Sequence, residues 1–139
     1  MNNALPRLSP ELESVVRSRS GRAYPSRPDF RLFLRRVLKT VSGGIGTHWA
    51  GYRAELMETA QSFINGAADD LAEWSGLLAA GAISADDFRW LLNSRAATSE
   101  MLGLSATGMS RGQVSHFRAL LIEGLVSAAV TTFLGTRSD

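Results

Sequence analysis

The stretch that decides the fold spans residues 47–80 and reads THWAGYRAELMETAQSFINGAADDLAEWSGLLAA. Its apolar side chains recur every eleven residues in three parallel registers. The registers are Ile45, Leu56, Ala67 and Leu78; Trp49, Ala60 and Leu71; and Tyr52, Phe63 and Trp74. Eleven residues in three turns give about 3.67 residues per turn, close to the relaxed α-helix, so the apolar stripe stays on one face. The spacing predicts one long helix over 47–80, about 50 Å in length.

The chain then returns along a second helical leg. Gly81 follows the last apolar residues and is typical of a helix end, and Ser84 with Asp87 three residues later is typical of a capping box. Because the connection is so short, the two helices must run antiparallel. The return leg is predicted over 85–134 with a kink near 103–112, and the fold is all-α, a long antiparallel helical hairpin.

The N-terminal part is predicted to be a basic helix preceded by an arm. Residues 29–41 have helical apolar spacing, and the three glycines within 42–46 are expected to end that helix. Ser9, Pro10 and Glu11 are typical of the start of a short helix. The sequence therefore divides into an arm over 1–28, with a short helix and a linker rich in Pro, Arg and Ser, and a helical bundle domain over 29–139.

Charge is distributed unevenly along the chain. Residues 1–39 carry nine basic and three acidic groups, a net charge of +6, and residues 40–139 carry six basic and ten acidic groups, a net charge of −4. A basic arm on an acidic body calls for an anionic partner. We expect the arm to dock on acidic neighbouring subunits. The residues expected to do so are Arg31, Arg35 and Arg36, with Asp69, Asp70, Asp86 and Asp87 as their counterparts.

An elongated hairpin leaves an apolar face that one copy of the chain cannot cover. Soluble monomers rarely expose such a face, so the sequence predicts self-association into a homo-oligomer or a larger assembly. The residues predicted to form this contact are Trp49, Tyr52, Leu56, Phe63, Leu71, Trp74, Phe117, Leu121 and Leu125. The function expected from the sequence is that of a non-enzymatic structural or assembly protein whose partner is itself.

Nucleic-acid binding is the second hypothesis. The arginines of the basic N-terminal helix have the charge needed to contact phosphates. In addition, residues 103–110, GLSATGMS, resemble the turn and the start of the recognition helix in helix-turn-helix DNA-binding domains. The resemblance covers 96–118 and implies that Arg111, His116 and Arg118 would meet phosphates.

A metal-dependent four-helix enzyme is the third hypothesis. Di-iron bundles use inward-facing Glu and Glu-x-x-His motifs, yet neither His48 nor His116 lies three residues after a glutamate. Glu55 and Glu58 fall beside the apolar stripe, as on a solvated face, and His48 with Glu55 makes only a two-residue cluster. There is no Gly-x-Ser-x-Gly motif. We therefore expect no enzyme, no cofactor and no metal site.

The absence of cysteine excludes disulfides, thiolate metal sites and a cysteine nucleophile. The N-terminus lacks the apolar core of a secretory signal. The most apolar run, 119–134, contains Glu123 and is shorter than the roughly 20 residues that a membrane span needs. The sequence thus predicts a cytoplasmic protein with no membrane span.

Overall fold

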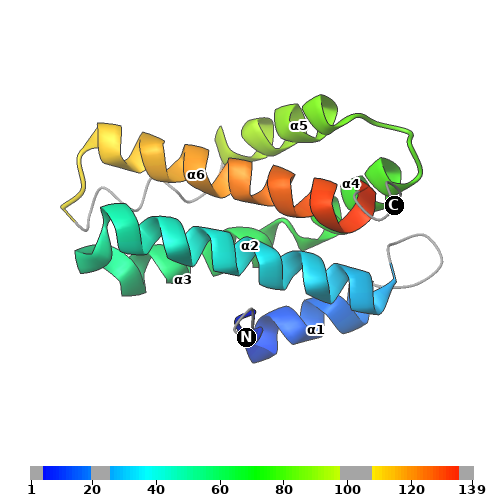
Figure 1. Cartoon of the computed structure of the whole chain (residues 1–139), viewed down its shortest axis with the longest axis horizontal. Coiled ribbons are helices and arrows are strands. Elements are labelled where there is room, and N and C mark those ends of the chain that lie inside the picture. The colour runs from blue at the N-terminus through cyan, green and yellow to red at the C-terminus, as the bar shows by residue number, and fades with distance from the viewer. Residues whose placement is uncertain (1–4, 20–25, 98–107, 135–139) are drawn as a thin grey trace.

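The computed structural model describes residues 5–19, 26–97 and 108–134, and over these residues the protein contains six α-helices and no strand (Figure 1). The helices are α1 (Pro10–Arg19), α2 (Arg27–His48), α3 (Arg53–Gly66), α4 (Ala68–Ala79), α5 (Ala85–Ala97) and α6 (Arg111–Ala129). A 3-10 turn, η1 (Ala50–Tyr52), precedes α3, and a π-helical turn, η3 (Val130–Leu134), follows α6. The predicted all-α fold is confirmed.

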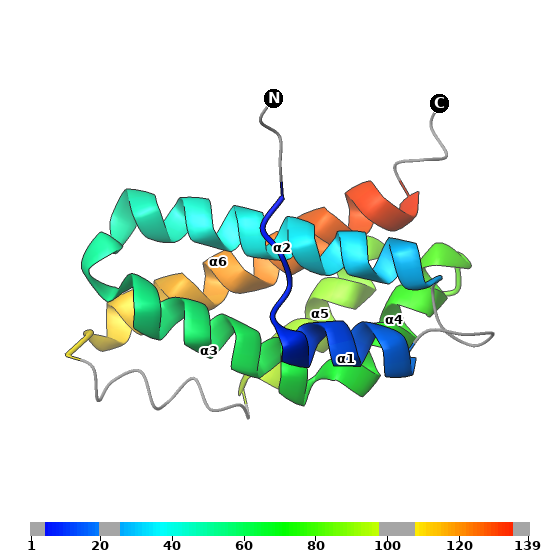
Figure 2. The same cartoon turned by 90° about the horizontal axis from the view of Figure 1, so that it is seen from below.

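The helices form an antiparallel bundle. Followed from α2, the chain reverses direction into α3 and α4, again into α5 and again into α6 (Figure 1). The two longest helices, α2 and α6, pack against each other along much of their length. Seen from below, α1 lies against α2 and the α3–α4 segment (Figure 2). Consequently α1 and α5 lie on opposite sides of the bundle.

Short polar residues fix the helix ends. The side chain of Ser9 accepts a hydrogen bond from the N–H of Leu12 at 3.3 Å at the start of α1. Before α5, the N–H of Asp87 donates to Ser84 Oγ and the N–H of Ser84 donates to Asp87 Oδ2, both at 3.0 Å, which confirms the predicted capping box. Gly81 has φ +81° and ends the α4 region, as its sequence position predicts.

The glycine-rich segment 42–46 does not break the helix, and the predicted end of the basic helix near residue 41 is wrong. α2 continues to His48, and the hydroxyl of Thr47 donates to the carbonyl of Gly43 at 3.0 Å inside this helix. Close packing against α6 explains one of the three glycines, Gly44. A Cβ at Gly44 would lie 2.6 Å from Leu120 Cδ2, so a larger residue there would force the Leu120 side chain to shift.

The predicted continuous helix over 47–80 is also wrong. Its first residues belong to α2, the chain turns at Trp49 and η1, and a second break at Ala67 separates α3 from α4. The apolar stripe nevertheless faces the core of the same copy. Of the three eleven-residue registers, only Tyr52 and Trp74 are half-buried, and the other members are buried. Burial therefore follows the helical period even where the helix is interrupted.

The return leg over 85–134 is two helices that lie side by side, so the predicted elongated hairpin is wrong. Arg89 Nε of α5 lies 2.8 Å from Glu123 Oε2 of α6. These residues are 34 positions apart, and along one continuous helix they would be separated by about 50 Å. Half of the predicted kink, residues 103–107, lies outside the described residues.

All six helices contribute to one apolar core. Its largest fully buried side chains include Phe30 and Phe33 of α2, Phe88 of α5 and Phe117 of α6. α1 adds Leu12, Val15 and Val16 to the same core. The surface on which α1 docks is thus supplied by the chain itself, where the sequence suggested a neighbouring subunit.

One segment among the described residues, Arg111–Leu134, is long and apolar enough to cross a membrane by length and composition. Its most apolar window has a mean hydropathy of 1.6, and 56% of that window is buried inside the bundle. Because α6 is the central core helix, its apolar character is explained by packing against the other helices. The structure does not indicate a membrane-spanning protein.

Candidate interaction surfaces

The apolar residues predicted to mediate self-association lie inside a single copy. Those that are buried are Trp49, Leu56, Phe63, Leu71, Phe117, Leu121 and Leu125, while Tyr52 and Trp74 are half-buried against the core. The buried side chains among them cannot contact a second copy unless the bundle opens. The premise of an uncovered apolar face is therefore wrong, and self-association, which remains a prediction, needs another surface.

The three arginines predicted to dock on a neighbour have partners within their own chain. Arg31 lies 3.1 Å from Glu13 Oε1 of α1. Arg35 donates to the carbonyls of Leu5 and Pro6 at 2.9 and 3.0 Å. These two contacts attach the N-terminal segment and α1 to α2, so the arm docks on its own bundle.

The third arginine, Arg36, reaches the other end of the chain. Its Nη1 donates to Thr132 Oγ1 at 3.0 Å, and Thr132 is buried in η3. Arg31, Arg35 and Arg36 are all half-buried on α2. Together they tie both terminal segments of the described chain to the central helix, and a role in docking on another copy would require them to exchange partners.

The acidic residues predicted as counterparts do not form a single patch, because three of them have separate local roles. Asp70 Oδ2 lies 3.4 Å from Arg95 Nη1, Asp86 Oδ1 lies 2.8 Å from Arg89 Nη1, and Asp87 caps α5. Asp69 is exposed in the first turn of α4.

Arg89 joins two acidic residues on α5 and α6. Glu123 of α6 accepts hydrogen bonds from Arg89 Nε and Nη2 at 2.8 and 3.2 Å, while Asp86 accepts from Nη1. The hydrogen bond and the charge of Glu123, with a smaller contribution from Asp86, raise the pKa of Arg89 above its ordinary value. This guanidinium fixes α5 against α6. The side of α5 that does not face the core is exposed to solvent.

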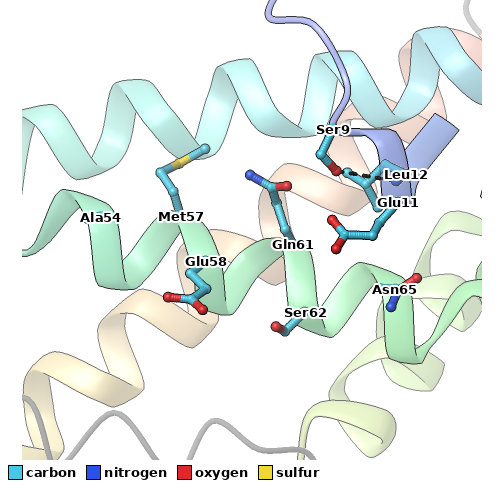
Figure 3. Close-up of a pocket in the computed structure, with 9 residues that line it drawn as sticks. All are labelled: Ser9, Glu11, Leu12, Ala54, Met57, Glu58, Gln61, Ser62 and Asn65. Carbon is cyan, nitrogen blue, oxygen red and sulfur yellow. Dashed lines mark hydrogen bonds between the residues drawn. The ribbon is translucent and has the colours of Figure 1, made fainter.

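A small polar groove lies between the start of α1 and α3 (Figure 3). It has a volume of about 360 Å³ and includes the carboxylates of Glu11 and Glu58 with the amides of Gln61 and Asn65. The hydroxyl of Ser9 at its edge is occupied in capping α1. The two carboxylates of the groove suit a small cationic group.

The most exposed large apolar side chain in the described part of the chain is Trp90 of α5, at 68% of its full exposure. One turn earlier, Asp86 and Asp87 are exposed, and one turn later Asn93 and Ser94 are exposed as well. The pattern Phe88, Leu92, Ala96 faces the core. That spacing would have placed Trp90 off the inward face, so this residue was predictable from the sequence.

The two histidines of the chain, far apart in the sequence, lie together. His48 is the last residue of α2, His116 is in α6, and their ring centroids are 5.3 Å apart. Both side chains are exposed, and buried Trp49 meets His116 edge-on at 5.0 Å. Sequence spacing groups His48 with Glu55 instead. The pairing was missed because it depends on how α2 is aligned with α6, which no local pattern indicates.

The structure bears only in part on the two remaining hypotheses, the metal-dependent enzyme and the helix-turn-helix domain. Among the described residues, no group of three or more His, Asp or Glu side chains lies close enough to hold a metal ion. Within the helix-turn-helix resemblance over 96–118, residues 98–107 lie outside the described residues. On its far side, Ser110 caps α6 by accepting from the N–H of Gln113 at 3.1 Å.

In comparisons with known proteins, no protein family, no curated protein and no solved structure matches this chain.

Proposed function

We propose that this protein is a non-enzymatic assembly protein that self-associates, and that the α5 face around Trp90 supplies the contact. The observation that carries the proposal is the exposure of Trp90 in a bundle whose aromatic core residues are enclosed. Tryptophan is enriched among the residues that dominate binding energy at protein interfaces. Its large apolar surface is removed from water when a partner covers it.

Charge supports a second copy of the chain as the partner. The α5 face presents the exposed carboxylates of Asp86 and Asp87 beside Trp90. The N-terminal part of the chain is strongly basic, and Arg7, Arg17 and Lys39 are exposed there. Arginine and lysine are attracted both to carboxylates and to the face of an indole ring. The basic side of one copy is therefore complementary to the α5 face of another.

The placement of these surfaces supports an assembly larger than a symmetric dimer. α1 and α5 lie on opposite sides of the bundle (Figure 1), so a contact from one copy's basic side to the next copy's α5 leaves a free surface of each kind. Such head-to-tail contacts produce rings or filaments. The proposal keeps the predicted docking of a basic N-terminal region on acidic neighbours in the cytoplasm, and it replaces Arg31, Arg35 and Arg36 with Arg7, Arg17 and Lys39.

Light scattering coupled to size-exclusion chromatography tests the proposal on the untagged, nuclease-treated chain. We expect a mass above that of one copy at low salt, a decrease at high salt because exposed charges are screened, and a monomer for Trp90→Ala. Leu77→Ala, at the other exposed large apolar residue of the described chain, is the matched control and should keep the assembly. A monomeric wild-type chain at high protein concentration and low salt would overturn the proposal.

The same experiment separates assembly from nucleic-acid binding. If the high mass depends on bound nucleic acid, nuclease treatment removes it and the absorbance ratio of the sample falls to that of protein alone. In that case the second hypothesis is supported and the self-association proposal fails. Retention of the high mass after nuclease treatment supports the contact between copies.

A further inference from the structure

We infer that His48 and His116 form a binding site for one divalent transition-metal ion of the Zn²⁺ or Cu²⁺ type, with one imidazole nitrogen from each residue. The site is at the end of the bundle where α2 finishes and α6 begins. It is independent of the proposed contact at Trp90, which is on α5.

The first support is the way in which α2 and α6 are aligned. Across this interface, Thr40 faces Gly124 and Gly44 faces Leu120. Each step of four residues along α2 corresponds to a step of four residues back along α6, as expected for antiparallel helices. The next step brings His48 to His116. Close helix packing therefore sets the approach of the two imidazoles, so their contact does not depend on a surface rotamer alone.

The second support is the distance between the rings. Zinc binds imidazole nitrogen at about 2.0–2.1 Å, which places the metal about 3.2 Å from each ring centroid. Two such ligands at a tetrahedral angle have centroids about 5.2 Å apart. The observed separation is 5.3 Å. The two rings thus already lie at the separation that a single ion requires, and rotation of the exposed rings would direct one nitrogen of each toward it.

The third support is the asymmetric environment of the pair. Trp49 meets His116 edge-on and also lies edge-on to Phe117, with centroids 6.0 Å apart. This aromatic contact packs one side of the site, while the exposure of both histidines lets water complete the coordination. Neutral imidazole is a ligand that zinc and copper favour. Trp49 is also a fluorescent reporter beside the site.

Isothermal titration of Zn²⁺ into the untagged full-length chain tests the inference. We expect one ion per chain, a binding constant weakened about tenfold or more in His48→Gln and in His116→Gln, and a rise in Tm of several degrees with excess Zn²⁺ because the ion binds only the folded chain. Quenching of tryptophan fluorescence by Cu²⁺ should follow the same order of variants. Circular dichroism in the presence of a chelator establishes that each variant is folded.

A variant that still has two histidines, one of them at a new position, controls for binding by isolated imidazoles. Thr47→His combined with His48→Gln moves one histidine to an exposed neighbouring position and turns it by about 100° around α2. Loss of binding in this variant supports the site. Binding as strong as in the wild type, wild-type affinity in either single His→Gln variant, or a stoichiometry of one ion per two chains would overturn the inference.

Discussion

Gly44 of α2 lies beneath Leu120 of α6, so close that a Cβ at position 44 would be 2.6 Å from Leu120 Cδ2 and 2.8 Å from its Cδ1. One turn earlier the relationship is reversed, because a Cβ at Gly124 of α6 would lie 3.4 Å from Thr40 Cγ2. A small residue on each helix thus accommodates a larger one on the other. These two pairs bring α2 and α6 close together and align His48 with His116.

The neighbouring glycines should respond differently to alanine. A Cβ at Gly43 would meet nothing within 4 Å, so Gly43→Ala should raise the free energy of unfolding by about 0.5–1 kcal/mol through helix propensity. Gly44→Ala gains the same helix propensity but forces Leu120 to move. Its free energy of unfolding should therefore be about 1–3 kcal/mol lower than that of Gly43→Ala. Urea denaturation measures both. If Leu120→Ala does not recover the loss in the Gly44→Ala background, or if the two glycines behave alike, the close approach is absent.

Periodicity predicted the class of fold and much of the core. The eleven-residue spacing placed Leu56, Ala60 and Leu71 on one apolar face, and all three are buried in the core of the same copy. The local capping signal of Ser84 and Asp87 predicted the start of α5 equally well, because a serine hydroxyl and a side chain three residues later act within one turn.

The arrangement of the helices was not predictable from the same signals. Glycines at 42–46 look like a break when only helix propensity is considered, and Leu120, which makes Gly44 favourable, is distant in the sequence. The contact between Arg89 and Glu123, which shows the return leg to be two helices, is equally non-local. The same limit hid the pair His48 and His116. Properties that arise within one turn were predicted, and those that need the helix alignment were not.

A substitution in the core should change stability without changing assembly, and a substitution at the exposed Trp90 should do the reverse. Leu121 is fully buried in α6, so Leu121→Ala should lower the free energy of unfolding by about 2–5 kcal/mol. The mass of the assembly that the folded chain forms should stay unchanged. Trp90→Ala should change that free energy by less than about 0.5 kcal/mol and reduce the mass. Denaturation combined with light scattering measures both quantities. If Leu121→Ala changes the mass of the assembly while the chain is folded, the buried apolar residues contribute to the contact between copies after all.

The hold of Arg35 on the N-terminal segment should control proteolysis. Arg35 donates to the carbonyls of Leu5 and Pro6, whereas Arg7 is exposed and offers trypsin a cleavage site. Loss of about 1 kcal/mol of hydrogen bonding in Arg35→Ala should increase the open population, and with it the cleavage rate after Arg7, about fivefold. Mass spectrometry of timed digests measures the rate. Lys39→Ala, at an exposed position of the same helix, is the control, and equal rates in the two variants would show that Arg35 does not hold this segment.

The capping box of α6 provides a test of how this helix begins. The N–H of Gln113 donates to Ser110 Oγ at 3.1 Å, and Gln113 Oε1 accepts from the N–H of Ser110 at 2.8 Å. Ser110→Ala removes the first bond and should lower the free energy of unfolding by about 1 kcal/mol. Ser115→Ala, an exposed position within the same helix, should be neutral or slightly stabilising because alanine has the higher helix propensity. Since α6 packs along α2, a frayed first turn would also loosen His116, so Ser110→Ala should weaken Zn²⁺ binding while Ser115→Ala leaves it unchanged. Equal effects of the two substitutions on stability would place the start of α6 elsewhere.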